Sequence, residues 1–221
     1  MSPAVAVARP RVAIADTGTG NLRSVEKALC AAGADAFVTA DADAIARADK
    51  VVVPGQGAFG GCMAGLTRAG GALEQAVRGA LAAGRPYLGI CLGLQVLFEG
   101  SDEDPSCRGL GLFPGRVRRL PAAPGLKIPH MGWNATRRGP AARTPALAPI
   151  PEGTFFYFVH SYYADPARPE DVALASDHGA AFCAAVARDN IFACQFHPEK
   201  SQAAGLALLR AFVWDSVKPT A

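Results

Sequence analysis

The sequence predicts an α/β fold in which a mostly parallel central sheet is covered by helices on both faces. In the first half of the chain, short apolar runs alternate with helical patterns, and glycine-rich turns separate them. This alternation is typical of parallel sheets, because each crossover helix packs on one face of the sheet. In the second half, aromatic and β-branched runs indicate additional antiparallel strands. With 221 residues, half of them hydrophobic, the chain suffices for one well-packed domain.

The first half is expected to supply four strands that end at one edge of the sheet. Each is a short apolar run bounded by turn residues. The predicted strands are Arg11–Asp16, Ala36–Thr39, Lys50–Val53 and Pro86–Ile90. In open parallel sheets, ligands bind at the carboxyl ends of the strands. The turns after these strands are therefore the first places to search for functional residues.

Three helices are expected in the same half. The first runs from about Asn21 to Ala32 and ends at Gly33, a residue that commonly terminates helices. A long helical stretch, Ala64–Ala83, is weakened by adjacent glycines at 70 and 71. A third pattern, Leu92–Glu99, directly follows the strand that ends at Ile90. The helices and strands together predict a doubly covered sheet.

The second half changes character. Proline and glycine are frequent from Pro105 to Pro151, and Thr154–Tyr163 is the strongest strand signal of the chain. Ala180–Ala187 and Ile191–Phe196 are expected to form a hairpin. A last helix is expected from Ser201, as its N-cap, to about Val217. We find no internal repeat and no second domain.

Composition excludes several classes of function. The net charge of +3 is too small to indicate nucleic-acid binding, and no apolar run approaches the length of a membrane span. None of the six cysteines forms a C-x-x-C pair, so no zinc or thioredoxin-like site is predicted. Without a secretory signal, we expect a cytoplasmic protein with free thiols, in which Cys30, Cys183 and Cys194 are small core residues.

A group of basic residues lies in the middle of the chain. A solvated surface is the favoured interpretation, and a face for an acidic partner or a phosphate-bearing substrate is the alternative. The group comprises Arg116, Arg118, Arg119, Lys127, Arg137 and Arg138.

Cys91 lies between two glycines at a predicted strand-to-helix junction. Glycine occupies positions 89 and 93, and such small neighbours are required where a nucleophile is presented on a sharp turn. The following helix N-terminus favours a thiolate, and the amide of Leu92 is placed to donate to an oxyanion. An isolated cysteine is usually an inert core residue, but this frame reverses that expectation.

His197 is the best candidate for a general base. Glu199 lies two residues later, and residues i and i+2 of an extended chain project to the same side. Glu199 can therefore orient the imidazole and leave its other nitrogen for Cys91, which is the logic of a catalytic triad. The other histidines are expected to be site walls or packing (His130 and His160) or part of a surface turn (His178).

Two glycine-rich turns carry weaker signals. Pro54–Gly57 follows a buried strand and is either an ordinary turn or a source of a second oxyanion amide. Thr17–Gly20 could cradle a phosphate, but it lacks the third glycine of a dinucleotide motif, so we infer no nucleotide cofactor.

Taken together, these motifs resemble class I (triad) glutamine amidotransferases, and more closely the glutaminase subunits of imidazole glycerol phosphate synthase. The class-wide motifs are Gly89–Gln95 and Gln195–Ser201, and the subfamily is suggested by the motifs at 20–24, 54–59, 129–134 and 157–162. The resemblance implies a flavodoxin-like class I amidotransferase fold. It also implies one amidotransferase domain at residues 11–217, preceded by an N-terminal extension at residues 1–10.

The resemblance further implies a role for each site residue. Cys91 would attack the side-chain amide of glutamine, His197 would carry the proton to ammonia, and Glu199 would orient His197. The residues expected to bind glutamine are Gln95, Glu103, Ser161 and Tyr162. The expected oxyanion residues are Gly55, Gln56, Gly57 and Leu92. The residues expected at a partner interface are Asn21, Trp133 and Tyr157.

The implied partner is a cyclase subunit of (β/α)₈ form, which would receive ammonia in histidine biosynthesis without any cofactor bound to this chain. Coupling of the two activities predicts that the isolated chain hydrolyses almost no glutamine.

Three alternative functions stay open: another triad amidotransferase, feeding purine, pyridoxal phosphate or aminobenzoate synthesis; a stand-alone cysteine hydrolase; and a non-catalytic subunit. The presence of all three triad candidates argues against a non-catalytic subunit, and the Pro129–Asn134 motif argues against another triad amidotransferase.

Overall fold

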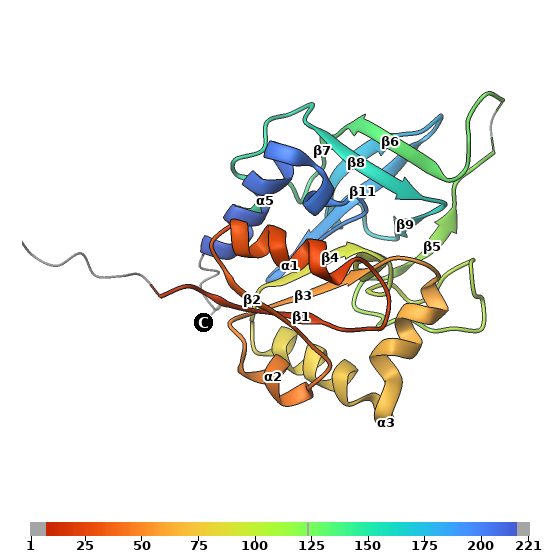
Figure 1. Ribbon diagram of the computed structural model, residues 1–221. Coiled ribbons are helices and arrows are strands. Elements are labelled where there is room, and N and C mark those ends of the chain that lie inside the picture. Colours follow the sequence, from red (N-terminus) through yellow and green to blue (C-terminus); the bar gives the residue numbers. More distant parts are fainter. Residues whose placement is uncertain (1–7, 123, 216–221) are drawn as a thin grey trace, which may run out of the picture.

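The computed structural model describes residues 8–122 and 124–215, in which one large sheet is covered by helices on both faces (Figure 1). Its parallel part has the order β2-β1-β3-β4-β12. These strands are β1 (Arg11–Ala15), β2 (Asp35–Thr39), β3 (Lys50–Gly55), β4 (Tyr87–Cys91) and β12 (Ile191–Cys194). The prediction of a mostly parallel sheet is confirmed.

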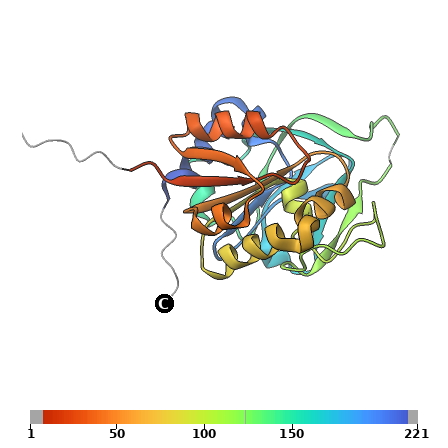
Figure 2. The same cartoon turned by 60° about the horizontal axis from the view of Figure 1, so that its bottom comes forward.

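Two pairs of helices cover the opposite faces of this sheet. In Figures 1 and 2, α1 (Leu22–Ala31) and α5 (Gln202–Trp214) lie on one face, and α2 (Ala42–Arg47) and α3 (Phe59–Ala82) lie on the other. Side chains alternate along β1, so Val12 and Ile14 enter one core while Ala13 and Ala15 enter the other. Burial on both faces explains why the strands are continuous apolar runs in the sequence.

Helices α2 and α3 and strand β3 differ from prediction. The short helix α2 was not predicted, and the Asp41 side chain caps it by accepting from the Asp43 amide. Helix α3 starts before its predicted residue, but it breaks at Arg68–Gly71, where the glycines weaken the pattern. Strand β3 continues through Pro54–Gly55, where the sequence predicted its end.

Helix α4 (Leu92–Gln95) is half as long as predicted. The carbonyls of Val96, Leu97 and Phe98 do not continue the helix, because they accept from amides of the 110–113 segment at 2.7–3.1 Å. A distant segment therefore takes the hydrogen bonds that the local pattern assigns to a helix.

Antiparallel strands extend the sheet from β12. Their order continues through β11 (Ala181–Arg188), β10 (Val172–Asp177) and β7 (Arg137–Arg138), while β9 (Tyr162–Pro166) pairs with β11 and β5 (Gly115–Arg119). The predicted hairpin is confirmed as β11–β12. A separate two-stranded ribbon joins β6 (His130–Ala135) to β8 (Phe155–His160).

The strand predicted at Thr154–Tyr163 is two strands. The chain breaks at Ser161, so β8 belongs to the ribbon and β9 to the large sheet. The aromatic run gives a strong strand signal throughout and cannot itself indicate a change of partner sheet. Helix α5 begins with Ser201 at its N-cap position, as predicted, although the Ser201 side chain makes no cap bond to it.

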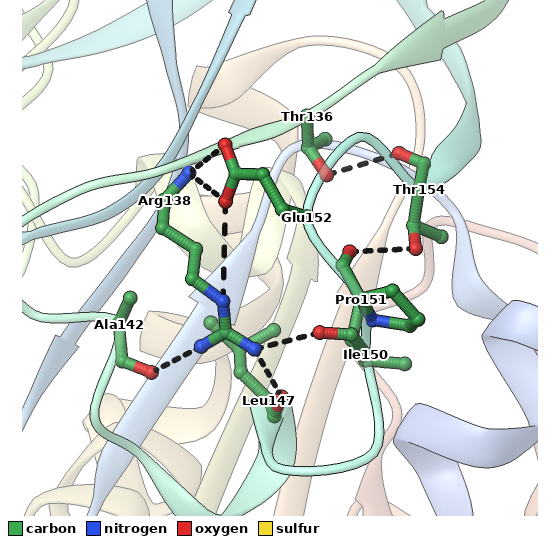
Figure 3. A network of polar contacts seen from close by, with 8 residues as sticks. All are labelled: Thr136, Arg138, Ala142, Leu147, Ile150, Pro151, Glu152 and Thr154. Carbon is green, nitrogen blue, oxygen red and sulfur yellow. Dashed lines mark hydrogen bonds and ion pairs between the residues drawn. The ribbon is translucent and has the colours of Figure 1, made fainter.

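Arg138 organises the proline-rich segment that follows β7 (Figure 3). Its guanidinium donates to the carbonyls of Ala142, Leu147 and Ile150 at 2.6–3.1 Å, and its backbone amide donates to the Glu152 carboxylate. Arg138, one member of the basic group, therefore stabilises a loop. Arg118, by contrast, pairs with Asp102 and Asp165 on the surface, at 3.6 and 3.5 Å.

Two expectations drawn from composition concern the cysteines and membrane spans. Cys183 and Cys194 are buried as expected, but Cys30 is exposed on α1, so its assignment to the core was wrong. Among the described residues, no helix combines the length and apolar character needed to cross a bilayer.

Candidate active site

Cys91 ends β4 and precedes α4 in a strained backbone conformation. Its φ of +55° lies in the region that side chains other than glycine rarely adopt. The two framing glycines allow this turn to pack, because a Cβ at Gly93 would overlap the Val53 carbonyl oxygen and one at Gly89 would overlap the Gly93 carbonyl. The strained backbone of Cys91 and the close packing of Gly89 and Gly93 together place the Cys91 sulfur at the end of the sheet.

His197 and Glu199 meet directly. His197 Nδ1 lies 2.8 Å from Glu199 Oε1, and both side chains are 1% exposed. The Nε2 atom is buried and bonds to no atom of the described residues. Since β12 lies next to β4, the segment that carries His197 leaves the sheet beside Cys91.

The environment of His197 favours its protonated form. Burial alone would lower its pKa, but the Cys91 sulfur and the Glu199 carboxylate outweigh burial and raise the pKa to about 9. At neutral pH the imidazole is therefore charged. A charged imidazole beside a thiol favours the thiolate, the nucleophilic form of cysteine.

The segment predicted to complete an oxyanion site lies beside the nucleophile turn. Gly55 is the registered neighbour of Cys91 across the β3–β4 pair, and a Cβ at Gly55 would lie 2.7 Å from the Leu92 Cβ. Gln56 and Gly57 line the same cleft as Cys91 and Leu92. The Leu92 amide is at the start of α4, where amides have no intrahelical acceptor.

A cleft of about 480 Å³ opens in front of Cys91. Gln95 lines it and donates through Nε2 to the Tyr162 carbonyl at 2.9 Å. Glu103 also lines it and accepts from the Phe59 amide at 2.7 Å, at the start of α3. Ser161 lies in the wall with Tyr162. The structure thus gathers all four residues predicted to bind glutamine around one cavity.

The residues predicted at a partner interface lie in two places. Trp133 and Tyr157 are paired across the β6–β8 ribbon, with ring centroids 6.0 Å apart. Their face of the ribbon also carries Met131 and Phe155, and three of these side chains are strongly exposed: Met131 (64%), Phe155 (56%) and Trp133 (42%). Asn21 is exposed at the start of α1, where its side chain accepts from the Ser24 amide.

Some residues at the site were not assigned from the sequence. Gln195 donates through Nε2 to the Cys91 sulfur at 3.4 Å, and Lys200 lines the cleft. Gln195 is the first residue of the Gln195–Ser201 motif that carries His197, and this place in the motif is the signal that could have found it. His130 and His160 form a buried pair, 3.1 Å apart, and His178 stacks on His130 instead of standing free in its turn.

Among the described residues, no cluster of three or more His, Cys, Asp or Glu side chains is arranged to hold a metal ion.

Comparison with known proteins agrees with this geometry. A family model described as glutamine amidotransferase class-I matches residues 13–216. The subunit HisH of imidazole glycerol phosphate synthase from Methylococcus capsulatus is 54% identical over 92% of this chain and 96% of its own. HisH from Methanothermobacter thermautotrophicus is 50% identical over 91% of this chain and 97% of its own.

Solved structures share the fold at lower identity. The PurLQS structure from Thermotoga maritima includes a chain that matches with a TM-score of 0.71 and 17% identity, covering 93% of this chain and 98% of that one. The glutaminase domain of CTPS from Trypanosoma brucei, solved with bound acivicin, matches with a TM-score of 0.61 and 17% identity, covering 92% of this chain and 93% of that one. At this identity the likeness concerns the fold alone, and it confirms the predicted amidotransferase architecture.

Proposed function

The chain belongs to the class I glutamine amidotransferases, and from this premise we propose that it is the glutaminase subunit of imidazole glycerol phosphate synthase. The observation that carries the proposal is the His197–Glu199 contact on the segment that follows β12, the strand next to β4, whose Cys91 lines a polar cleft. The chain is also about half identical to HisH subunits over nearly their full length. The activity is hydrolysis of glutamine to glutamate and ammonia, in histidine biosynthesis.

In the first chemical step, the Cys91 thiolate attacks the side-chain carbonyl carbon of glutamine. The carbonyl oxygen becomes an oxyanion, which the Leu92 amide and the Gly55–Gly57 segment are positioned to receive. His197 then gives its proton to the leaving nitrogen, so ammonia departs and a thioester remains on Cys91. Glu199 holds the imidazole through Nδ1, so that Nε2 faces the reaction.

The second step hydrolyses the thioester. Neutral His197 takes a proton from water, hydroxide adds to the thioester carbonyl, and Cys91 leaves as a thiolate paired with the recharged imidazole. Glutamate is released and the resting state returns. The raised pKa of His197 suits this cycle, because the charged imidazole holds the proton that the leaving nitrogen needs.

We assign glutamine binding to the polar wall of the cleft. The Gln95 amide nitrogen is engaged by protein acceptors, which leaves its Oε1 to meet the ammonium group of the substrate. Glu103 supplies a negative charge for the same group, and Ser161 and Tyr162 supply backbone groups for the substrate carboxylate.

The partner is a cyclase subunit that uses the ammonia to make imidazole glycerol phosphate and aminoimidazole carboxamide ribonucleotide. We propose that it docks on the apolar ribbon face formed by Met131, Trp133, Phe155 and Tyr157, beside the cleft, with Asn21 as a further contact. Exposed apolar side chains grouped in this way are typical of protein interfaces. We place the complex in the cytoplasm, where its free thiols would stay reduced.

The decisive experiment measures glutamine hydrolysis with and without the cyclase and its nucleotide ligand. We expect low turnover for the chain alone and a large increase when the loaded cyclase is present. Cys91→Ser should abolish turnover, whereas Cys30→Ser, which changes an exposed thiol on α1, serves as the matched control and should retain it. Equal turnover with and without the cyclase, or activity in Cys91→Ser, would contradict the proposal.

A further inference from the structure

A chain of buried hydrogen bonds ends on the Cys91 sulfur, and it does not involve His197. We propose that Gln195 is a further catalytic residue, whose side-chain amide donates to the Cys91 thiolate and stabilises it. This inference rests on the proposed glutaminase function, and it extends the site from a triad to four side chains. Gln195 Nε2 lies 3.4 Å from the sulfur, the distance expected of a hydrogen bond to sulfur.

The orientation of the Gln195 amide follows from its neighbours. The oxygen and nitrogen of a glutamine amide are distinguished by the groups they meet. The Tyr162 carbonyl can only accept, so it fixes Gln95 Nε2 as a donor at 2.9 Å. The same nitrogen uses its second proton toward Gln195 Oε1 at 3.0 Å, which leaves Gln195 Nε2 to face Cys91. The donor at the sulfur is therefore specified by a backbone carbonyl two side chains away.

The outer end of this chain is also held in place. The Tyr162 carbonyl accepts a second hydrogen bond, from His160 Nδ1 at 3.0 Å. Burial lowers the pKa of His160 to about 3, so the ring is neutral and its single N–H is committed to that carbonyl. His160 Nε2 in turn contacts His130 Nδ1 at 3.1 Å. The carbonyl that orients Gln95 is thus fixed between two donors.

Gln195 cannot exchange this contact for water. Its side chain is fully buried, and its backbone amide donates to the Ala184 carbonyl at 2.8 Å. Gln195 donates to the Cys91 sulfur, and the same sulfur raises the pKa of His197, two residues later. One short segment after β12 therefore delivers a neutral donor and a charged imidazole to the same sulfur.

The chemistry of this donor complements that of His197. The proton of Cys91 passes to His197, and Gln195 forms and breaks no covalent bond. A hydrogen bond to an ionised acceptor is stronger than one to a neutral acceptor, and low exposure strengthens it further; Cys91 is only 6% exposed. The Gln195 amide therefore increases the fraction of Cys91 present as thiolate without adding a charge that competes with Glu199 for the imidazolium.

The test reads the thiolate directly and needs no glutamine. We would follow iodoacetamide alkylation of Cys91 in the full chain between pH 5 and 10, by mass spectrometry of the peptide that contains Cys91, with the Cys107 peptide as internal reference. Gln195→Met keeps the side-chain length but removes the donor. We expect the midpoint of the Cys91 profile to rise by about one pH unit and the rate at pH 7 to fall about tenfold.

Two further variants keep the test decisive. Gln202→Met makes the same substitution at an exposed position on α5, and its profile should match that of the parent chain. If Gln195→Met does not fold, as judged by its melting curve, Gln195→Glu replaces it. Glutamate can still accept from Gln95 but repels a thiolate, so the midpoint should rise at least as far.

An unchanged midpoint in a folded Gln195 variant would overturn the inference. This failure is distinct from failure of the proposed function: it would leave cyclase-dependent glutaminase turnover intact. Conversely, a shifted alkylation profile in a chain that hydrolyses no glutamine with its cyclase would reject the function and retain the Gln195–thiolate contact.

Discussion

The two segments that build the catalytic centre are held by different forces. The nucleophile turn, Gly89–Gly93, is fixed by steric exclusion, because its glycines approach neighbouring backbone too closely for any side chain. The base segment, Gln195–Ser201, is fixed by hydrogen bonds: the His197 amide donates to the Tyr157 carbonyl at 2.9 Å, and the Ser201 hydroxyl donates to the His197 carbonyl at 2.7 Å. The nucleophile turn cannot change its backbone path without disrupting the sheet, whereas the base segment can lose single hydrogen bonds and keep the others.

This difference between steric exclusion and hydrogen bonding determines how each segment tolerates amino-acid substitutions. Steric overlap costs energy steeply, since backbone on both sides of the turn is fixed by parallel strands. Each hydrogen bond contributes only a modest increment to stability. We therefore expect substitutions in the nucleophile turn to prevent folding, and those in the base segment to lower activity or to cost only a few kcal/mol of stability.

The largest effect is expected for Gly93→Ala. The added Cβ would overlap the Val53 carbonyl oxygen, so the free energy of unfolding should fall by more than about 4 kcal/mol. Gly79→Ala is the matched control, because a Cβ there meets no atom within 4 Å and helix α3 should gain up to about 1 kcal/mol. Denaturant unfolding measures both. Equal stability in the two variants would contradict the claim that steric exclusion fixes the nucleophile turn.

Glu199→Gln should separate activity from folding. The amide oxygen can still accept from His197 Nδ1, but the negative charge that favours the imidazolium is lost. We expect kcat/KM for glutamine, measured with the cyclase, to fall about 10²–10⁴-fold while the melting temperature changes little. Glu74→Gln, which alters an α3 carboxylate paired with Arg78, should leave kcat/KM unchanged. Full activity in Glu199→Gln would show that the carboxylate charge is not used.

His197 predicts a pH dependence of stability. Its pKa is raised from 6.5 to about 9 in the folded chain, so the folded state binds this proton more tightly than the unfolded state. The resulting stability is fully present below pH 6.5 and is lost as pH rises through 9. Relative to His197→Asn, the extra stability should amount to about 3 kcal/mol at most. A difference that grows with pH would contradict the raised pKa.

The smallest effect is expected for Ser201→Ala. The hydroxyl donates to the His197 carbonyl and accepts from the Tyr157 amide at 3.0 Å, so its loss removes two bonds from the base segment. The free energy of unfolding should fall by about 1–3 kcal/mol. Ser106→Ala removes an exposed hydroxyl bonded to Asp104 and should change stability by less than about 0.5 kcal/mol. Comparable effects in both variants would mean that the base segment does not depend on these bonds.

Sequence patterns located the nucleophile turn well because its requirements are local. Glycine at 89 and 93, and an apolar run ending at Cys91, describe one strand-to-helix junction within a few residues. The pairing of His197 with Glu199 is also local, but its geometry differs from the extended chain that predicted it. Pro198–Lys200 form a 3-10 turn, and from this turn Glu199 still meets the imidazole. Ser201 lies at the predicted N-cap position, but its side chain makes no cap bond, and its hydroxyl instead accepts from the Tyr157 amide of the distant β8 strand.

Other features had no local signature. The break at Ser161 divides one aromatic run between two sheets. Helix α4 ends early because the carbonyls just after it accept from amides of the 110–113 segment. Arg138 resembled a member of a surface cluster, yet its guanidinium bonds three carbonyls of a loop. In each case a contact between residues far apart in the chain outweighed the local preference.

The sequence by itself determined the chemical groups of this site, the α/β class and the family, because side-chain type, glycine spacing and strand periodicity are properties of short segments. Only the tertiary structure decided that β4 lies between β3 and β12, which brings Gly55, Cys91 and His197 to one edge of the sheet. It also decided that Gln195, 104 residues from Cys91, faces the sulfur. The physical reason is that strand order follows from burying both faces of the whole sheet, a requirement no short segment contains.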